Sequence, residues 1–235
     1  MAGELALNSV KKNIAATHSR GRELAEFAVA YGLILLVLWT PRPWQKLFWW
    51  IAAATIAAIF SRSFEGLEAM GLRRANFLRS LWVVGVALLA SAAAIAVAAR
   101  LHTLRLPGSP MLLIKTYIGY ALWAFAQQFL MQCFFFSRLR RIVANARVAA
   151  VIAAVIFAAA HLPNPILMPV TLLWGAAACL LFLRYRNLYP LAMAHAIVGI
   201  TIAVTVPGTV DHNMRVGLGY LSYGHTHEAI HSAQP

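Results

Sequence analysis

One stretch of the sequence, residues 112–136, is long and apolar enough to cross a lipid bilayer as a single helix. It also carries three glutamines, Gln127, Gln128 and Gln132. Lipid offers no hydrogen-bond partner at membrane depth, so these amides must find partners inside the protein. On a helix Gln128 and Gln132 share a face, and Gln127 lies one step round from Gln128. We therefore expect this face to point into a bundle of helices.

The composition indicates a membrane protein. Of the 235 residues, 61% are hydrophobic and only 11% are charged, and the mean hydropathy is +0.71. Further apolar runs predict an all-α, polytopic transmembrane helical bundle of about seven spans, near residues 24–40, 47–60, 77–99, 112–136, 148–161, 168–183 and 190–206. We divide the chain into a cytosolic or interfacial segment (1–22), a transmembrane domain (23–206) and a polar C-terminal tail (207–235).

The net charge of +13 would suggest a nucleic-acid partner in a soluble chain. Here the basic residues lie between the apolar runs, as in the connector 137–147, where we expect them to meet anionic headgroups of the bilayer. In a seven-span arrangement, lysine and arginine are in excess in the segments that lie on the same side of the membrane as the N-terminus. We therefore predict an integral multi-pass protein of the plasma (inner) membrane, with a cytosolic N-terminus, the lipid bilayer as partner and no nucleic acid.

Two histidines, His161 and His195, lie in later apolar runs. At ~1.5 Å per residue, they and the glutamines fall roughly 8–20 Å from the cytosolic surface, so all five side chains can share one cavity. His161 precedes Pro163, so it could instead bond the frayed end of its own helix. The two histidines lack a third acidic or cysteine ligand, and no metal site is predicted.

The order of these motifs resembles the CPBP family of intramembrane endopeptidases, which includes the CAAX prenyl proteases and the bacteriocin-processing (Abi) proteins. The family pattern is Glu-Glu-x-x-x-Arg, then Phe-x-x-x-His, then His-x-x-x-Asn or Asp. Phe157 and His161 match the second motif, and His195 opens the third. The resemblance covers about residues 60–200, and the Gly71-Leu-Arg-Arg74 stretch is similar to another recurring family feature.

The sequence departs from the family pattern at four positions. Glutamine replaces both glutamates and the arginine, and glycine replaces Asn or Asp, at Gln127, Gln128, Gln132 and Gly199. The resemblance implies an intramembrane-protease-like fold that cleaves membrane-bound or prenylated peptides in a cytosol-facing cavity. It implies catalytic roles for His161, His195, Gln127 and Gln128, with cavity support from Gln132, Phe157, Asn164 and Gly199. The family is often described as metal-dependent, and the cofactor is left open.

The chemistry of the replaced residues leaves two hypotheses. A carboxamide cannot take up a proton near neutral pH, but it can position a water molecule or an oxyanion. Residues 69–210 contain no Asp or Glu, so a neutral histidine, or Glu65 or Glu68 from the preceding loop, would have to act as the base. The chain is then either an endopeptidase of altered chemistry or a non-catalytic relative (a pseudoprotease). Such a relative would bind a lipidated peptide, a lipid or a membrane protein partner.

Overall fold

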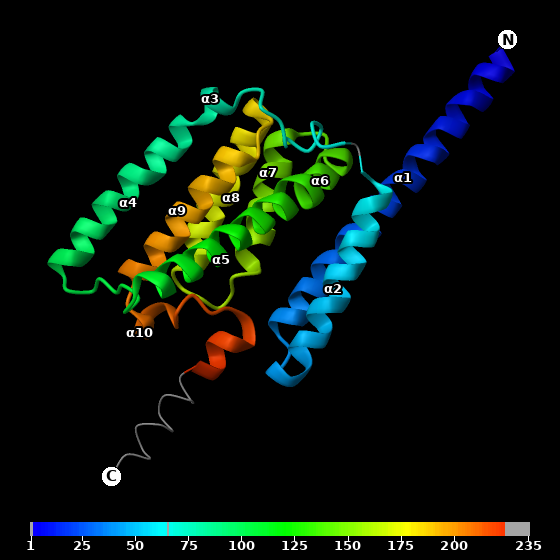
Figure 1. The fold of residues 1–235 in the computed structure, drawn as a ribbon. Coiled ribbons are helices and arrows are strands. Elements are labelled where there is room, and N and C mark those ends of the chain that lie inside the picture. Colours follow the sequence, from blue (N-terminus) through cyan, green and yellow to red (C-terminus); the bar gives the residue numbers. More distant parts are fainter. Residues whose placement is uncertain (1, 65, 224–235) are drawn as a thin grey trace.

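The computed structural model describes the backbone of residues 2–64 and 66–223, and every regular element in these ranges is helical (Figure 1). The helices are α1 (Ala2–Leu38), α2 (Arg42–Arg62), α3 (Phe77–Ser80), α4 (Trp82–Arg100), α5 (Pro110–Phe129), the π-helix η1 (Leu130–Phe136), α6 (Ser137–Ile142), α7 (Ala146–Ala159), α8 (Leu167–Tyr185), α9 (Tyr189–Thr205) and α10 (Gly208–Asp211). The all-α prediction is confirmed, and a helix lies at each of the seven apolar runs.

Among the described residues, two stretches, Phe77–Arg100 and Leu167–Tyr185, are long and apolar enough to cross a membrane, so the count of seven spans stays a prediction. Two local predictions were wrong. Residues 137–142, expected in a connector, continue the helix through α6. Residues 42–46, expected between the first two spans, are the first residues of α2, because a proline in the first turn lacks only an N–H that would have no partner there. The N-terminal segment 1–22 is continuous with the first predicted span, since α1 begins at Ala2.

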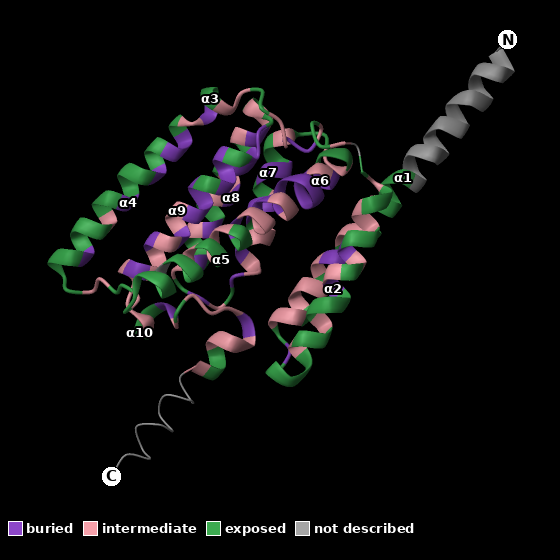
Figure 2. Cartoon of the chain, in the orientation of Figure 1, coloured by how far each residue is buried: buried purple, intermediate pink, exposed green. Residues whose placement is uncertain are grey.

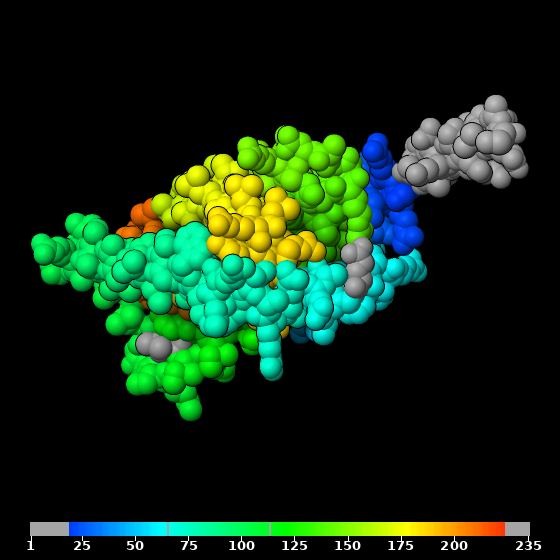
Figure 3. Space-filling model, turned by 90° about the horizontal axis from the view of Figure 1, so that it is seen from above, coloured from blue at the N-terminus to red at the C-terminus, as the bar shows by residue number. Residues whose placement is uncertain are grey.

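The helices form a central bundle with a further layer on each side. Helix α7 packs on α8, and α5 and α4 both pack on α9. The α1–α2 hairpin lies on the side of the bundle away from α4 (Figure 1). Buried positions gather in the central helices, whereas α4 is largely exposed, with Leu89 at 74% (Figure 2). Figure 3 shows α3 and α4 laid along one edge of the molecule. These exposed apolar side chains suit contact with lipid.

The loop before α3 fixes where α9 begins. Gly71 has a φ of +77°, and a Cβ there would lie 2.6 Å from the Phe182 ring, so only glycine fits. Its carbonyl accepts a hydrogen bond from the Leu188 N–H at 2.9 Å. The Asn187 amide donates to the Arg73 carbonyl at 2.7 Å. The Gly71–Arg74 stretch therefore anchors the α8–α9 turn, and through it the position of His195.

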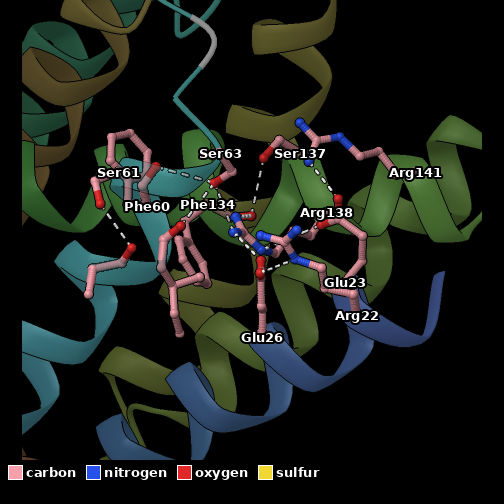
Figure 4. Close-up of polar contacts among 12 residues, drawn as sticks. Arg22, Glu23, Glu26, Phe60, Ser61, Ser63, Phe134, Ser137, Arg138 and Arg141 are labelled. Atoms are coloured by element: carbon pink, nitrogen blue, oxygen red, sulfur yellow. Dashed lines mark hydrogen bonds and ion pairs between the residues drawn. The ribbon is translucent and has the colours of Figure 1, made fainter. Parts of the chain in front are cut away.

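A buried ion cluster joins the hairpin to α6 (Figure 4). Arg138 is only 1% exposed, and its Nη2 donates to Glu26 at 2.8 Å and to the Ser63 hydroxyl at 3.1 Å. Its Nε lies 3.5 Å from the Glu23 carboxylate, which also accepts a hydrogen bond from Arg141 at 2.7 Å. Arg138 was expected at the lipid headgroups with the rest of its connector. That expectation was wrong, because two α1 carboxylates compensate its charge inside the protein.

Candidate functional site

A cavity of about 740 Å³ lies between the α1–α2 hairpin and the central helices. Side chains from α1, α2, α5, η1, α7, α8 and α9 line it, and most of them are apolar. The polar or hydrogen-bonding side chains on its wall are Tyr31, Trp49, Tyr120, Trp123, Gln127, His161, Thr171, Trp174 and His195. Three of the four residues predicted to be catalytic therefore face one space.

The fourth, Gln128, supports the wall from behind. It is fully buried, and its Nε2 lies 3.1 Å from Nδ1 of His195. Its Oε1 accepts a hydrogen bond from Nε2 of Gln132 at 3.4 Å. These residues form a chain of polar side chains from η1 through α5 to α9. The prediction that Gln128 and Gln132 share an inward face agrees with this geometry.

The Gln128 amide presents its nitrogen, and not its oxygen, to Nδ1 of His195. An amide N–H can only donate, so Nδ1 of a neutral His195 must accept. The proton of the ring then sits on Nε2, and the ring lines the cavity. A glutamate at position 128 would accept instead and would place the proton on Nδ1. With glutamine at this position, the neutral His195 ring that fits the contact carries its proton on Nε2.

His161 has the complementary pattern. Its Nδ1 lies 2.7 Å from the Phe157 carbonyl oxygen, which can only accept, so Nδ1 carries the proton and Nε2 keeps its lone pair. The Phe157 ring packs edge-on against both imidazoles, with centroid distances of 4.9 Å to His161 and 5.9 Å to His195. His161 therefore bonds the end of its own helix and also faces the cavity, so the two interpretations of this residue are compatible.

The remaining predicted site residues, catalytic Gln127 and the support residues Gln132 and Gly199, differ in their surroundings. Gln127 is half-buried on the cavity wall, and no hydrogen bond of its side chain occurs within the described part of the chain. Gln132 is buried behind Gln128, and its Oε1 has no partner there. Gly199 lies on the wall one turn after His195, against the ring of Tyr120. The position that departs from the family pattern on α9 is thus tightly packed.

Asn164 acts on the backbone and does not line the cavity. Its Oδ1 accepts hydrogen bonds from the N–H groups of Ile166 and Leu167 at 3.0 and 2.9 Å, which starts α8. Its Nδ2 donates to the carbonyls of Asp211 and Arg215 at 2.8 and 3.0 Å. Asn164 therefore holds the segment after α10 across the end of the bundle, and the neighbouring residues 214 and 216 close that end of the cavity.

Sequence reasoning missed the other polar or hydrogen-bonding side chains of the wall, which are Tyr31, Trp49, Tyr120, Trp123, Thr171 and Trp174. Tyr120 had a signal, because it lies seven residues before Gln127 and so shares its helix face. Trp174 had none, and its Nε1 is buried without a partner among the described residues. Tyr31 donates to the Ile156 carbonyl at 3.0 Å and ties α1 to α7.

The described part of the wall contains no carboxylate. Glu23 and Glu26 are paired with arginines, Glu68 is exposed, and Glu65 lies outside the described residues. Within the described residues, no group of three or more His, Cys, Asp or Glu side chains is placed to hold a metal ion. The donor set of the cavity, two imidazoles with amides and hydroxyls, does not fit a resident catalytic metal.

Comparison with known families agrees with this arrangement. Residues 109–201 match the family model described as type II CAAX prenyl endopeptidase, Rce1-like. The searches of curated proteins and of solved structures gave no match. The matched segment runs from the start of α5 into α9 and contains the glutamines and both histidines. This family and the apolar helices indicate a membrane protein. Over residues 109–201 the chain is similar to the Rce1-like CAAX-type endopeptidases, in agreement with the resemblance found in the sequence.

Proposed function

We propose that this protein is an intramembrane endopeptidase of the CAAX type in which two neutral histidines replace glutamate-based chemistry. The observation that carries the proposal is that two imidazoles on one cavity wall have different partners at Nδ1, a backbone carbonyl oxygen for His161 and the Gln128 amide nitrogen for His195. His161 presents a lone pair on Nε2, and His195 presents an N–H on Nε2. A base and a hydrogen-bond donor are the two groups that hydrolysis of an amide needs.

In the proposed reaction, Nε2 of His161 removes a proton from a water molecule as its oxygen attacks the peptide carbonyl carbon. The Nε2–H of His195 donates to the carbonyl oxygen as negative charge develops there. The imidazolium of His161 then gives its proton to the leaving nitrogen, and the C–N bond breaks. The amides behind the wall stay neutral throughout. Gln128 keeps His195 in the donor tautomer, and Gln127 is available to hold the attacking water.

The apolar wall supports a membrane-bound substrate. Most of the cavity surface comes from aliphatic and aromatic side chains, and its volume of about 740 Å³ would hold a short peptide segment with an attached apolar chain. We propose prenylated or otherwise membrane-bound peptides as substrates. The cavity would open toward the cytosol, as the charge distribution of the sequence predicts.

The test is a cleavage assay in liposomes with farnesylated and unmodified tetrapeptide-tailed substrates. We expect wild-type cleavage, and a loss of about 10²–10⁴-fold in His161→Ala and His195→Ala, the size usual for an acid–base group or an oxyanion donor. The matched control is His102→Asn, because His102 is exposed in the α4–α5 loop with a φ of +56°, which asparagine tolerates. It should retain wild-type activity.

A specific observation favours a second candidate, a cavity that binds such peptides without cleaving them. No carboxylate lies on the described wall, and a histidine alone is a weak base for water. In the same assay this candidate gives a silent wild type, with activity appearing only in the Gln127→Glu/Gln128→Glu double variant. That result would overturn the proposed histidine chemistry. Binding of the farnesylated peptide to the wild type in nanodiscs would then identify the function of the cavity.

A further inference from the structure

Tyr120 occupies the space that a side chain at position 199 would fill. A Cβ built on Gly199 would lie 1.9 Å from the Tyr120 hydroxyl oxygen and 2.4 Å from its Cζ. Helices α5 and α9 pack directly on each other, so the phenol is held at that place by both. Residue 199 follows His195 by one helical turn on nearly the same face of α9. The Tyr120 hydroxyl therefore lies about one turn from the imidazole.

The hydroxyl of Tyr120 is not used to hold the fold. No hydrogen bond of this side chain occurs within residues 2–64 and 66–223, and the residue lines the cavity. The other tyrosine on the wall differs, since Tyr31 donates its hydroxyl hydrogen to the Ile156 carbonyl at 3.0 Å. One tyrosine is thus a structural tie, and the other brings an uncommitted donor to an apolar wall.

The wall near His195 offers few other donors. The Gln128 amide nitrogen already contacts His195, and the indole Nε1 of Trp174 is buried without a partner among the described residues. A phenol is neutral at ordinary pH, so it adds a strong donor without burying a charge in the membrane. A donor that is already in place and free of protein partners stabilises charge on a substrate oxygen at little cost in reorganisation.

We propose that Tyr120 is a carbonyl-binding residue of this cavity. Its hydroxyl donates to the same peptide carbonyl oxygen as the Nε2–H of His195, and it thereby does from α5 what a polar side chain at position 199 would do from α9. Gly199 is glycine because the phenol needs its volume. The inference rests on the proposed function, since it assumes that a peptide carbonyl enters the cavity, but it does not require that the peptide be cleaved.

A binding assay tests the role of Tyr120 separately from the proposed cleavage reaction. The first probe is a farnesylated tetrapeptide analogue in which a ketomethylene group replaces the scissile amide, so it keeps the carbonyl and cannot be hydrolysed. The second carries an ethylene group there and has no carbonyl. We expect wild type to prefer the ketomethylene probe, and Tyr120→Phe to lose about three- to tenfold of that preference, the value of one neutral hydrogen bond. Affinity for the ethylene probe should not change.

The matched control is Tyr31→Phe, which removes the same hydroxyl from the opposite wall and should leave the preference intact. A rescue variant tests the position itself. Tyr120→Ala/Gly199→Asn removes the ring and places an amide from α9 in its space, and it should recover most of the preference that Tyr120→Ala loses. A Tyr120→Phe variant with the full wild-type preference would overturn the inference. A wild type that keeps the preference but never cleaves the amide substrate would overturn only the proposed catalysis.

Discussion

Two adjacent glutamines offer a direct test of the polar chain behind the cavity. Gln128 is fully buried and bonded to both His195 and Gln132, whereas Gln127 is half-buried with no hydrogen bond in the described structure. Methionine has nearly the shape of glutamine and cannot donate a hydrogen bond. Gln128→Met leaves Nδ1 of His195 and Nε2 of Gln132 buried without partners. At about 1–3 kcal/mol for each such group, the loss in the free energy of unfolding is about 2–6 kcal/mol.

This loss is large enough to measure by thermal unfolding of the detergent-solubilised protein. For a chain of this size, 1 kcal/mol shifts the midpoint by roughly 2–4 °C, so we expect Gln128→Met to lower it by roughly 4–24 °C. Gln127→Met changes a side chain that holds nothing in place and should stay within about 0.5 kcal/mol of wild type. Equal shifts in the two variants, or a larger one in Gln127→Met, would refute the described division between a supporting and a cavity-facing glutamine.

Two further predictions concern charged groups away from the cavity. Arg138→Met leaves the α1 carboxylates Glu23 and Glu26 without their buried partner. We therefore expect the free energy of unfolding to fall by about 3–5 kcal/mol, and to recover in part in Arg138→Lys. A fall of under about 1 kcal/mol would contradict the cluster as described. Burial raises the pKa of the Asp211 carboxyl, against the lowering effect of the Asn213 N–H, so the folded state binds the proton more tightly than the unfolded state. Wild type should therefore gain stability relative to Asp211→Asn as the pH falls from 7 toward 4, and a difference that is independent of pH, or of the opposite sign, would contradict this account.

Most of the fold could be predicted from the sequence, because hydrophobic periodicity and prolines mark helices directly. The sequence placed a helix at every apolar run and brought Gln128 toward His195 from motif order alone. The burial of Arg138 could not be predicted from the sequence. A basic residue beside other basic residues gives no sign that it will pair with two carboxylates far away in the chain. The role of Asn164 could not be predicted either, because it depends on backbone groups of a segment 47 residues away. Such contacts depend on packing between distant helices, which local patterns do not encode.

The same limit applies to Tyr120 and Gly199. Neither residue alone indicates a functional role, since aromatic and small side chains are both common on apolar helices. Their meaning comes from the distance between the helices, which leaves room for one side chain at that level and not for two. The sequence showed that a polar residue was absent from position 199, and the structure shows which side chain fills the gap.

The π-helix η1 connects the polar site to the ion cluster within one continuous helical segment, so it sets the angle between them around the helix axis. Its seven residues follow Gln128 and precede Arg138, and its wider turns change the angle between these side chains from that of an unbroken α-helix. Deleting one residue of η1 would return the segment toward α-helical winding and swing the two ends out of phase. Gln128 could keep its bond to His195, or Arg138 its bonds to α1, but not both. The phase of this one helix thus couples the cavity wall to the attachment of the hairpin that covers it.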